Sequence, residues 1–237
     1  MDMIRKLYAD LIAEFFSDVV LNSSCADIGC GTLPTPLSLV RICRKVFIYD
    51  IDCKVTDIYR RHPKTTPLCT DIEDAEVFGD GQLKLVLALN ILEHLKSPPR
   101  TLKKLYRSMA PGGYLLASVP STSPECRTAF KGDKTHMWLL PRVAWIEIAT
   151  EVGFLYAEEA TRRLVSAVKP KLIKTVPRSF IHLYKVSMQY PLESRLSGYI
   201  GVLTGLFHRF RLVVNPCSEI MLFSKRVDER GVDRAHS

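Results

Sequence analysis

The chain has 237 residues, of which 47% are apolar and 24% are charged, and its formal net charge is +8. This length fits one domain, or one domain with an elaboration, and the composition is that of an ordinary globular protein. Acidic residues near the start argue against a signal peptide, and no apolar run reaches the roughly 18 uncharged residues of a membrane span, so we expect a soluble, cytoplasmic protein.

The cysteines do not follow a recognisable pattern. There are seven, at positions 25, 30, 43, 53, 69, 126 and 217, with no CxxC pair and no Cys/His ligand spacing. An odd number without such spacing argues against a secreted disulfide scaffold and against structural zinc. We therefore expect no disulfide framework and no metal centre.

The predicted elements begin with an amphipathic helix over residues 3–20, where apolar residues recur at helical spacing. Strand-like and helix-like segments then alternate along the chain. Strands are predicted at 24–28, 45–51, 68–74, 83–90, 114–120, 154–162 and 219–226, and helices at 36–43, 98–109 and 140–153. Such alternation is typical of α/β proteins, so we predict a doubly wound, seven-stranded, mostly parallel sheet.

Basic residues gather in the last third of the chain. Between positions 161 and 226 there are twelve Lys and Arg residues against two acids, Glu193 and Glu219. We therefore divide the chain into a core, a basic helical insertion before the last strand and a disordered tail. The core takes residues 1–163 and 218–226, the insertion 164–217 and the tail 227–237.

The insertion has two interpretations. Apolar residues at helical spacing predict a helix over 195–214, which would either close the site as a lid or lie on a membrane surface. In the second case His208, Arg209 and Arg211 would meet anionic lipid headgroups. Three glycines weaken this segment as an isolated helix, so we expect it to pack against the core in either case.

A glycine-containing loop follows the first predicted strand, in the stretch CADIGCGTLPTPLSLV over residues 25–40. A dinucleotide fingerprint needs a third glycine where this chain has Pro34, and no Gly-Lys-Ser/Thr follows as a P-loop requires. The carboxylate of Asp27, at the strand end, would also repel a negatively charged pyrophosphate. The loop is therefore expected to hold something less anionic than a phosphate.

Four segments in order carry a resemblance to a known family. They are ADIGCGT at 26–32, VFIYDID at 46–52, CTDIED at 69–74 and LKLVLALNILEHLKSPPRTLKKLYRSMAPGGYLLASVP at 83–120. Together they resemble the class I S-adenosylmethionine-dependent methyltransferases, most of all their small-molecule branch of the type 11/12 kind. The resemblance covers roughly residues 21–157 and implies a Rossmann-like methyltransferase fold with S-adenosylmethionine as cofactor.

The resemblance implies cofactor contacts in the glycine loop. Gly29 and Gly31 would let the backbone approach the methionine part of the cofactor, where a Cβ would clash. Cys30 between them is expected to act as a small apolar residue and not as a nucleophile. Asp27 would interact with the cofactor's ammonium group, directly or through water.

Further cofactor residues are implied at the ends of the next strands. Asp50, with Ile51 beside it, would bind both ribose hydroxyls. Asp71 would take the exocyclic amine of adenine while Ile72 packs on the ring. Asn90 ends the fourth predicted strand, where the backbone would face cofactor and acceptor. All of these positions lie at the carboxyl ends of strands, where open α/β sheets bind ligands.

Two features depart from the family pattern. The loop usually continues to a third glycine, whereas this chain has Leu33 followed by Pro34, which stiffens the turn and would narrow the methionine channel. The minimal family fold also lacks the basic insertion at 164–217.

Other polar residues near the expected site have plainer interpretations. Asp52 is expected to cap the next helix, and Glu93 with His94 to orient a helix start. His136 is the candidate catalytic residue, because it follows the fifth predicted strand and should lie over the cofactor mouth. A neutral imidazole there could remove a proton from an acceptor hydroxyl. The alternative is a loop histidine bonded to nearby backbone.

The acceptor itself stays open at this point. The first hypothesis is methyl transfer to an oxygen, nitrogen or carbon atom of a small or lipid-like, anionic or neutral metabolite held beneath the insertion. The second is RNA bound along the basic residues, which lack the interleaved aromatic platform that unpaired bases usually need. The third is a non-catalytic partner protein that keeps the fold, against which the acids at 27, 50 and 71 argue.

Overall fold

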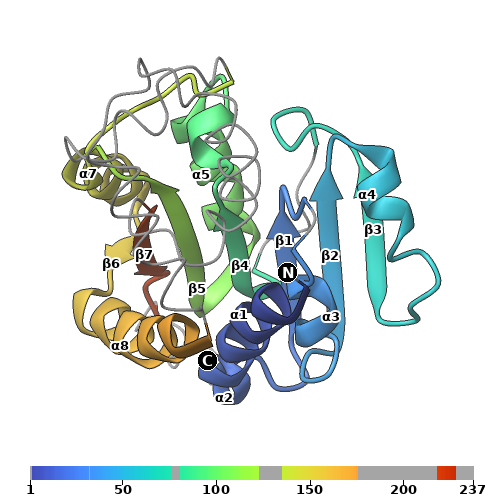
Figure 1. Cartoon of the computed structure of the whole chain (residues 1–237). Coiled ribbons are helices and arrows are strands. Elements are labelled where there is room, and N and C mark those ends of the chain that lie inside the picture. Colours follow the sequence, from blue (N-terminus) through green and yellow to red (C-terminus); the bar gives the residue numbers. More distant parts are fainter. Residues whose placement is uncertain (1, 32, 76–80, 123–134, 176–217, 228–237) are drawn as a thin grey trace, which may run out of the picture.

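Figure 1 shows the computed structural model, which describes residues 2–31, 33–75, 81–122, 135–175 and 218–227. The strands are β1 (Ser24–Ile28), β2 (Lys45–Asp50), β3 (Thr65–Cys69), β4 (Leu83–Leu89), β5 (Met109–Pro120), β6 (Leu155–Tyr156) and β7 (Ser218–Ser224). The helices are α1 (Asp2–Phe15), α2 (Ser17–Val20), α3 (Thr35–Leu39), α4 (Cys53–Asp57), the 3-10 turn η1 (Leu92–His94), α5 (Pro98–Ser108), α7 (Arg142–Val152) and α8 (Glu158–Thr175).

The strands form one seven-stranded sheet in the order β3-β2-β1-β4-β5-β7-β6. All pairs are parallel except β5–β7 and β6–β7, which are antiparallel. This confirms the predicted seven-stranded, mostly parallel sheet. The strand order reverses between β1 and β4, and such a switch point opens a crevice at the carboxyl ends of the strands.

Helices cover both faces of the sheet, so the central strands are buried on both sides and read as continuous apolar runs (Figure 1). On one face α1 lies between α3 and α8, and its apolar side packs onto β1, β2 and β4. On the other face α5 and α7 contribute the buried side chains of Leu102, Leu105 and Trp145. The core is thus two apolar layers separated by the sheet.

Several boundaries differ from the prediction. The segment 3–20 forms two helices, α1 and α2, and the predicted helix over 36–43 ends at Leu39. The third strand, predicted at 68–74, is Thr65–Cys69, because the chain turns where the Asp71 carboxylate accepts the N–H of Glu73. The fifth strand is longer than predicted and includes the segment APGG at its start.

The prediction of a strand over 154–162 is wrong beyond its first residues. Only Leu155 and Tyr156 pair with β7, and the chain then starts α8 at Glu158. Acidic residues suit a first helical turn, and Glu158 and Glu159 pair with Arg162 and Arg163 one turn later. The helix therefore runs through position 164, where the insertion was expected to begin.

Most of the expected insertion, and with it the helix expected at 195–214, lies outside the described residues, as does the tail from residue 228. Within the part of the chain that the structure describes, no helix combines the length and apolar character that a membrane span needs.

Candidate cofactor and acceptor site

The glycine loop after β1 is shaped by two left-handed residues. Gly29 has φ +64°, its N–H donates to the Tyr49 carbonyl at 2.7 Å, and a Cβ there would lie 2.7 Å from side-chain atoms of Ile91. Gly31 has φ +51°, and a Cβ built on it meets no heavy atom of the described residues within 4 Å. The loop is therefore packed closely on the Ile91 side and has open space at Gly31, as a loop that cradles a ligand would.

Asp27 is buried beneath this loop, with 1% of its surface exposed. Its Oδ2 atom has no hydrogen-bond partner among the described residues. Burial, and to a lesser extent the Asp50 carboxylate, raises the pKa of Asp27 to about 7. A buried carboxylate in this state is stabilised by an incoming cationic group, which fits the ammonium of the expected cofactor.

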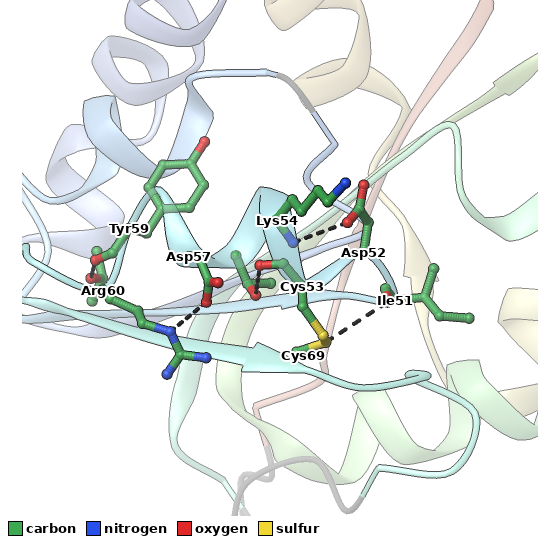
Figure 2. A network of polar contacts seen from close by, with 10 residues as sticks. Ile51, Asp52, Cys53, Lys54, Asp57, Tyr59, Arg60 and Cys69 are labelled. Carbon is green, nitrogen blue, oxygen red and sulfur yellow. Dashed lines mark hydrogen bonds and ion pairs between the residues drawn. A yellow bond between two sulfur atoms is a disulfide. The ribbon is translucent and has the colours of Figure 1, made fainter.

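Asp50 at the end of β2 holds the loop in place. Its carboxylate accepts the N–H of Gly31 and the N–H of Asp52, both at 2.9 Å. A carboxylate offers about four lone-pair directions, so these two bonds leave room for hydroxyl donors. Asp52 caps α4 by accepting the N–H of Lys54 at 3.0 Å, which confirms its predicted capping role (Figure 2).

A disulfide joins Cys53 at the start of α4 to Cys69 at the end of β3 (Figure 2). The cysteine pattern argued against a disulfide scaffold and gave no indication of this single bond. Asp50 pairs with Cys69 across the parallel strands β2 and β3, so Cys53, one turn onward, comes to lie over Cys69 with a Cα–Cα distance of 4.8 Å. The pairing of β2 with β3 brings the two cysteines together, and their spacing in the sequence does not reveal this pairing.

Ile51 and Ile72 lie in contrasting environments. Ile51 follows the carboxyl end of β2, next to Asp50 and close to the disulfide, and its side chain is 75% exposed (Figure 2). It therefore presents an uncovered apolar surface. Ile72 is 5% exposed and packs into the core beside α5. The Asp71 carboxylate accepts the N–H of Glu73 at 2.9 Å and so shapes the turn after β3.

Sequence inspection missed the contacts that fix this turn. The Glu73 carboxylate accepts the N–H groups of Lys96 and Ser97, at 2.8 and 2.7 Å, just before α5. Lys104 donates from α5 to the carbonyls of Ile72, Glu73 and Ala75. The spacing of Glu73 and Lys104 in the chain carries no signal of this contact.

Two tyrosines missed by the sequence analysis surround Asp27. Tyr8 of α1 is buried, and burial together with the charge of Asp27 raises its pKa to about 12. The Tyr59 hydroxyl donates to the Leu33 carbonyl at 3.1 Å. The Leu33 side chain is 7% exposed and belongs to the core cluster on the α1 side, so the residue that replaces the family's third glycine packs into the core.

Asn90 follows β4 with a left-handed backbone, φ +53°. Its N–H donates to the Ser118 carbonyl at 2.9 Å, and its side-chain oxygen accepts the Ser118 hydroxyl at 3.0 Å. Both ends of Asn90 are therefore tied to β5. Asparagine tolerates this conformation better than most residues, and such strain collects at functional sites.

His136 lies beside Glu93 and His94, and we call these residues the Glu93–His94–His136 cluster. Their potential ligand atoms all lie within 4.8 Å of one another. The rings of His94 and His136 are 4.8 Å apart between centroids, and Glu93 is 1% exposed. The sequence analysis singled out His136 but interpreted Glu93 and His94 as structural, because nothing in the sequence places residue 136 against η1.

Comparisons with known proteins identify the family and the fold of this chain. A family model described as a methyltransferase domain matches residues 2–164. A putative methyltransferase from Bacillus halodurans is 17% identical, with a TM-score of 0.57 over 91% of this chain and 99% of that one. Phosphoethanolamine N-methyltransferase 2 from Haemonchus contortus, in complex with S-adenosyl-L-methionine, is 16% identical, with a TM-score of 0.57 over 92% of this chain and 51% of that one.

A third similar structure is a putative sarcosine dimethylglycine methyltransferase from Galdieria sulphuraria, 14% identical, with a TM-score of 0.57 over 91% of this chain and 84% of that one. At these identities the structural likeness shows the fold alone. A comparison of the sequence with curated proteins finds no match.

Proposed function

The chain belongs to the methyltransferase domain family as an S-adenosylmethionine-dependent enzyme, and from that premise we propose that it methylates a small or lipid-like metabolite. The observation that carries the proposal is the buried carboxylate of Asp27, whose Oδ2 has no hydrogen-bond partner within the described ranges, beneath a glycine loop that is open at Gly31. A cofactor that brings a cationic amino group into this loop would neutralise a charge that the fold buries at a cost.

The other cofactor contacts extend along the sheet edge from Asp27. Asp50 has lone pairs left over for the two ribose hydroxyls, and exposed Ile51 offers an apolar face to adenine. Asp71 and Ile72 remain the proposed partners of the adenine amine and ring, with Cys30 and Asn90 as neighbours of the methionine part. A ligand bound this way runs across the carboxyl ends of β1, β2 and β3, as is usual for open α/β sheets.

S-adenosylmethionine supplies an activated methyl group as a sulfonium, whose departure needs no acid. The chain's own task is then to align the acceptor with the methyl carbon and to exclude water. Positioning of this kind lowers a barrier by about 7–11 kcal/mol. The rigid loop at Gly29, packed against Ile91, and the doubly tied Asn90 suit such a role.

His136 is the residue that we propose to meet the acceptor's nucleophilic group. Its segment is bonded through the backbone to η1, and η1 follows Asn90 and Ile91 in the chain. The His136 residue is partly exposed. A metabolite is favoured over RNA because the basic residues of the last third of the chain are not interleaved with the aromatic platform that unpaired bases usually need.

The proposal is tested by incubating the full chain with methyl-labelled S-adenosylmethionine and cell extract separated into lipid, small-molecule and RNA fractions. Label that appears in the lipid or small-molecule fraction, and is lost when His136 is replaced by alanine, supports the proposal. Label that appears only in RNA, and disappears on ribonuclease treatment, overturns it in favour of the RNA hypothesis.

A further inference from the structure

We propose that the Glu93–His94–His136 cluster binds one divalent metal ion, which in turn holds the oxygen atom of the methyl acceptor. The inference rests on the proposed function, and it narrows the substrate class to acceptors methylated on a hydroxyl oxygen. Neither the methyltransferase domain family match nor the cysteine and histidine spacing assigns a metal to this chain.

The geometry of the cluster is that of a slightly expanded metal site. Two imidazoles and one carboxylate present ligand atoms that all lie within 4.8 Å of one another. Ligands bound to zinc at about 2.0–2.2 Å lie roughly 3.3 Å from each other in a tetrahedron. A contraction of up to about 1.5 Å between ligand atoms, which rotation of two partly exposed histidine rings can supply, would close the cluster around an ion.

The hydrogen bonding of His94 directs one ring nitrogen toward the cluster. Its Nδ1 lies 3.0 Å from the carbonyl oxygen of Thr135, and since a carbonyl can only accept, Nδ1 carries the proton. In the neutral ring the lone pair is then on Nε2, which lies 3.9 Å from Oε1 of Glu93, too far for a hydrogen bond. A histidine whose second nitrogen donates to a backbone carbonyl is the usual arrangement of a metal ligand.

Backbone contacts hold His136 against the other two ligands. The Glu93 carbonyl accepts the N–H of Met137 at 2.8 Å and the N–H of Trp138 at 3.1 Å. The Trp138 indole N–H donates to the Leu95 carbonyl at 2.8 Å. The two residues after His136 are thus bonded to Glu93 and Leu95 of the η1 region. The position of His136 relative to Glu93 is therefore fixed by backbone bonds and not by side chains alone.

Three protein ligands leave a coordination position free, which is typical of catalytic and not of structural metal sites. Imidazole and carboxylate ligands together suit zinc and related divalent transition ions. The cluster also follows Ile91, which packs against Gly29 of the cofactor loop. The cluster is thereby placed next in sequence to a residue that contacts the cofactor loop.

The ion changes the role of His136. An imidazole that binds a metal through one nitrogen and keeps a proton on the other cannot take a proton from the acceptor. The ion instead lowers the pKa of the acceptor hydroxyl, whose proton goes to solvent. The acceptor oxygen then bonds to the methyl carbon while the carbon–sulfur bond breaks and its electron pair stays on sulfur.

The experiment is a calorimetric titration of the chelator-stripped full chain with Zn²⁺, repeated for His94→Gln, His136→Gln and the control His62→Gln. His62 lies in the turn before β3, where its Nδ1 accepts the N–H of Lys64, outside the cluster. We expect one Zn²⁺ per chain in the wild type and in His62→Gln, and at least tenfold weaker binding in the other two variants. No binding by the wild type, or equal binding by all four proteins, overturns the inference.

A second titration, with S-adenosylhomocysteine, separates this inference from the proposed function. The stripped and the Zn²⁺-loaded protein are expected to bind S-adenosylhomocysteine equally, within about twofold, because none of the proposed cofactor contacts belongs to the cluster. If Zn²⁺ binds but S-adenosylhomocysteine does not, the proposed function fails while the metal site stands. If labelled methyl transfer continues unchanged in the stripped protein, the metal role in catalysis is overturned.

Discussion

The cofactor end and the acceptor end of the site are built in different ways. At the proposed cofactor end, Asp27, Gly31 and Asp50 all lie at or next to the ends of two paired strands, and the Gly31 N–H donates to the Asp50 carboxylate. At the acceptor end, Glu93 and His94 meet His136 from a distant segment, and backbone bonds to Glu93 hold that segment. The first arrangement follows from strand pairing, whereas the second depends on how a loop docks.

Because of this difference, substitutions at the two ends should affect cofactor affinity to different extents. At the proposed cofactor end the carboxylate of Asp27 is buried at a cost in free energy that a bound ammonium group would offset, so single substitutions there should have large and specific effects on cofactor affinity. Substitutions at the proposed acceptor end should change cofactor affinity little. The following predictions are ordered by their expected effect on the affinity for S-adenosylhomocysteine, measured by calorimetry.

The largest effect is expected for Asp27→Asn. Loss of the buried carboxylate leaves the ligand's ammonium without a partner, which weakens binding by about 10²–10³-fold. The same variant should raise the free energy of unfolding of the free protein at pH 8 by about 2–4 kcal/mol, because the wild-type protein buries a charge there. The control is Asp57→Asn, an exposed acid paired with Arg60. Unchanged affinity in Asp27→Asn would remove the ammonium assignment.

The second effect is expected for Asp50→Ala. This change removes the acceptor of the Gly31 N–H and the proposed partner of the ribose hydroxyls, so affinity should fall about 10–100-fold. The matched control is Asp52→Ala, which removes only the cap of α4 and should cost about 1 kcal/mol of stability with little change in affinity. Equal affinity losses in both variants would mean that Asp50 acts through the helix and not on the ligand.

A third prediction concerns pH. Because the pKa of Asp27 in the free protein is raised to about 7, cofactor binding below this pH must first remove a proton. Affinity is expected to fall by up to about tenfold for each pH unit below 7 and to stay level above it. A flat profile between pH 5 and 8 would contradict the raised pKa, and Asp27→Asn should itself give a flat profile.

The stability of the free protein should change in the opposite sense. The folded-state pKa of Asp27 lies above its ordinary value of 3.8, so the folded protein holds a proton that the unfolded chain has lost between about pH 4 and 7. The contribution of Asp27 to stability therefore decreases as pH rises through this range and is constant above it. Denaturant titrations of wild type and Asp27→Asn at pH 5 and 8 measure the difference.

The smallest effect on affinity is expected for the double variant Cys53→Ser/Cys69→Ser. The disulfide closes a loop with a sequence separation of 16, so its loss should lower the free energy of unfolding by about 3 kcal/mol. The affinity should change by no more than about threefold, since neither sulfur is a proposed ligand contact. Reducing agent should bring the wild type to the level of the variant. A fall in affinity as large as that of Asp50→Ala would place the disulfide within the adenine end of the site.

The fold class could be predicted from the sequence alone. Alternating strand-like and helix-like runs specify a parallel sheet, because buried parallel strands must be apolar on both faces while crossover helices need only one apolar side. Local propensity and periodicity carry this information, and no distant contact is needed. Asp27, Asp50 and Asn90 follow predicted strands, and their proposed cofactor roles come from the resemblance to the methyltransferases and not from the apolar pattern.

Only the tertiary structure decided the contacts between segments far apart in the chain. The disulfide of Cys53 with Cys69 depends on the pairing of β2 with β3. The convergence of His136 on Glu93 and His94 depends on backbone bonds between a loop and η1. These outcomes are set by packing and by the satisfaction of backbone polar groups, which spacing along one chain does not encode.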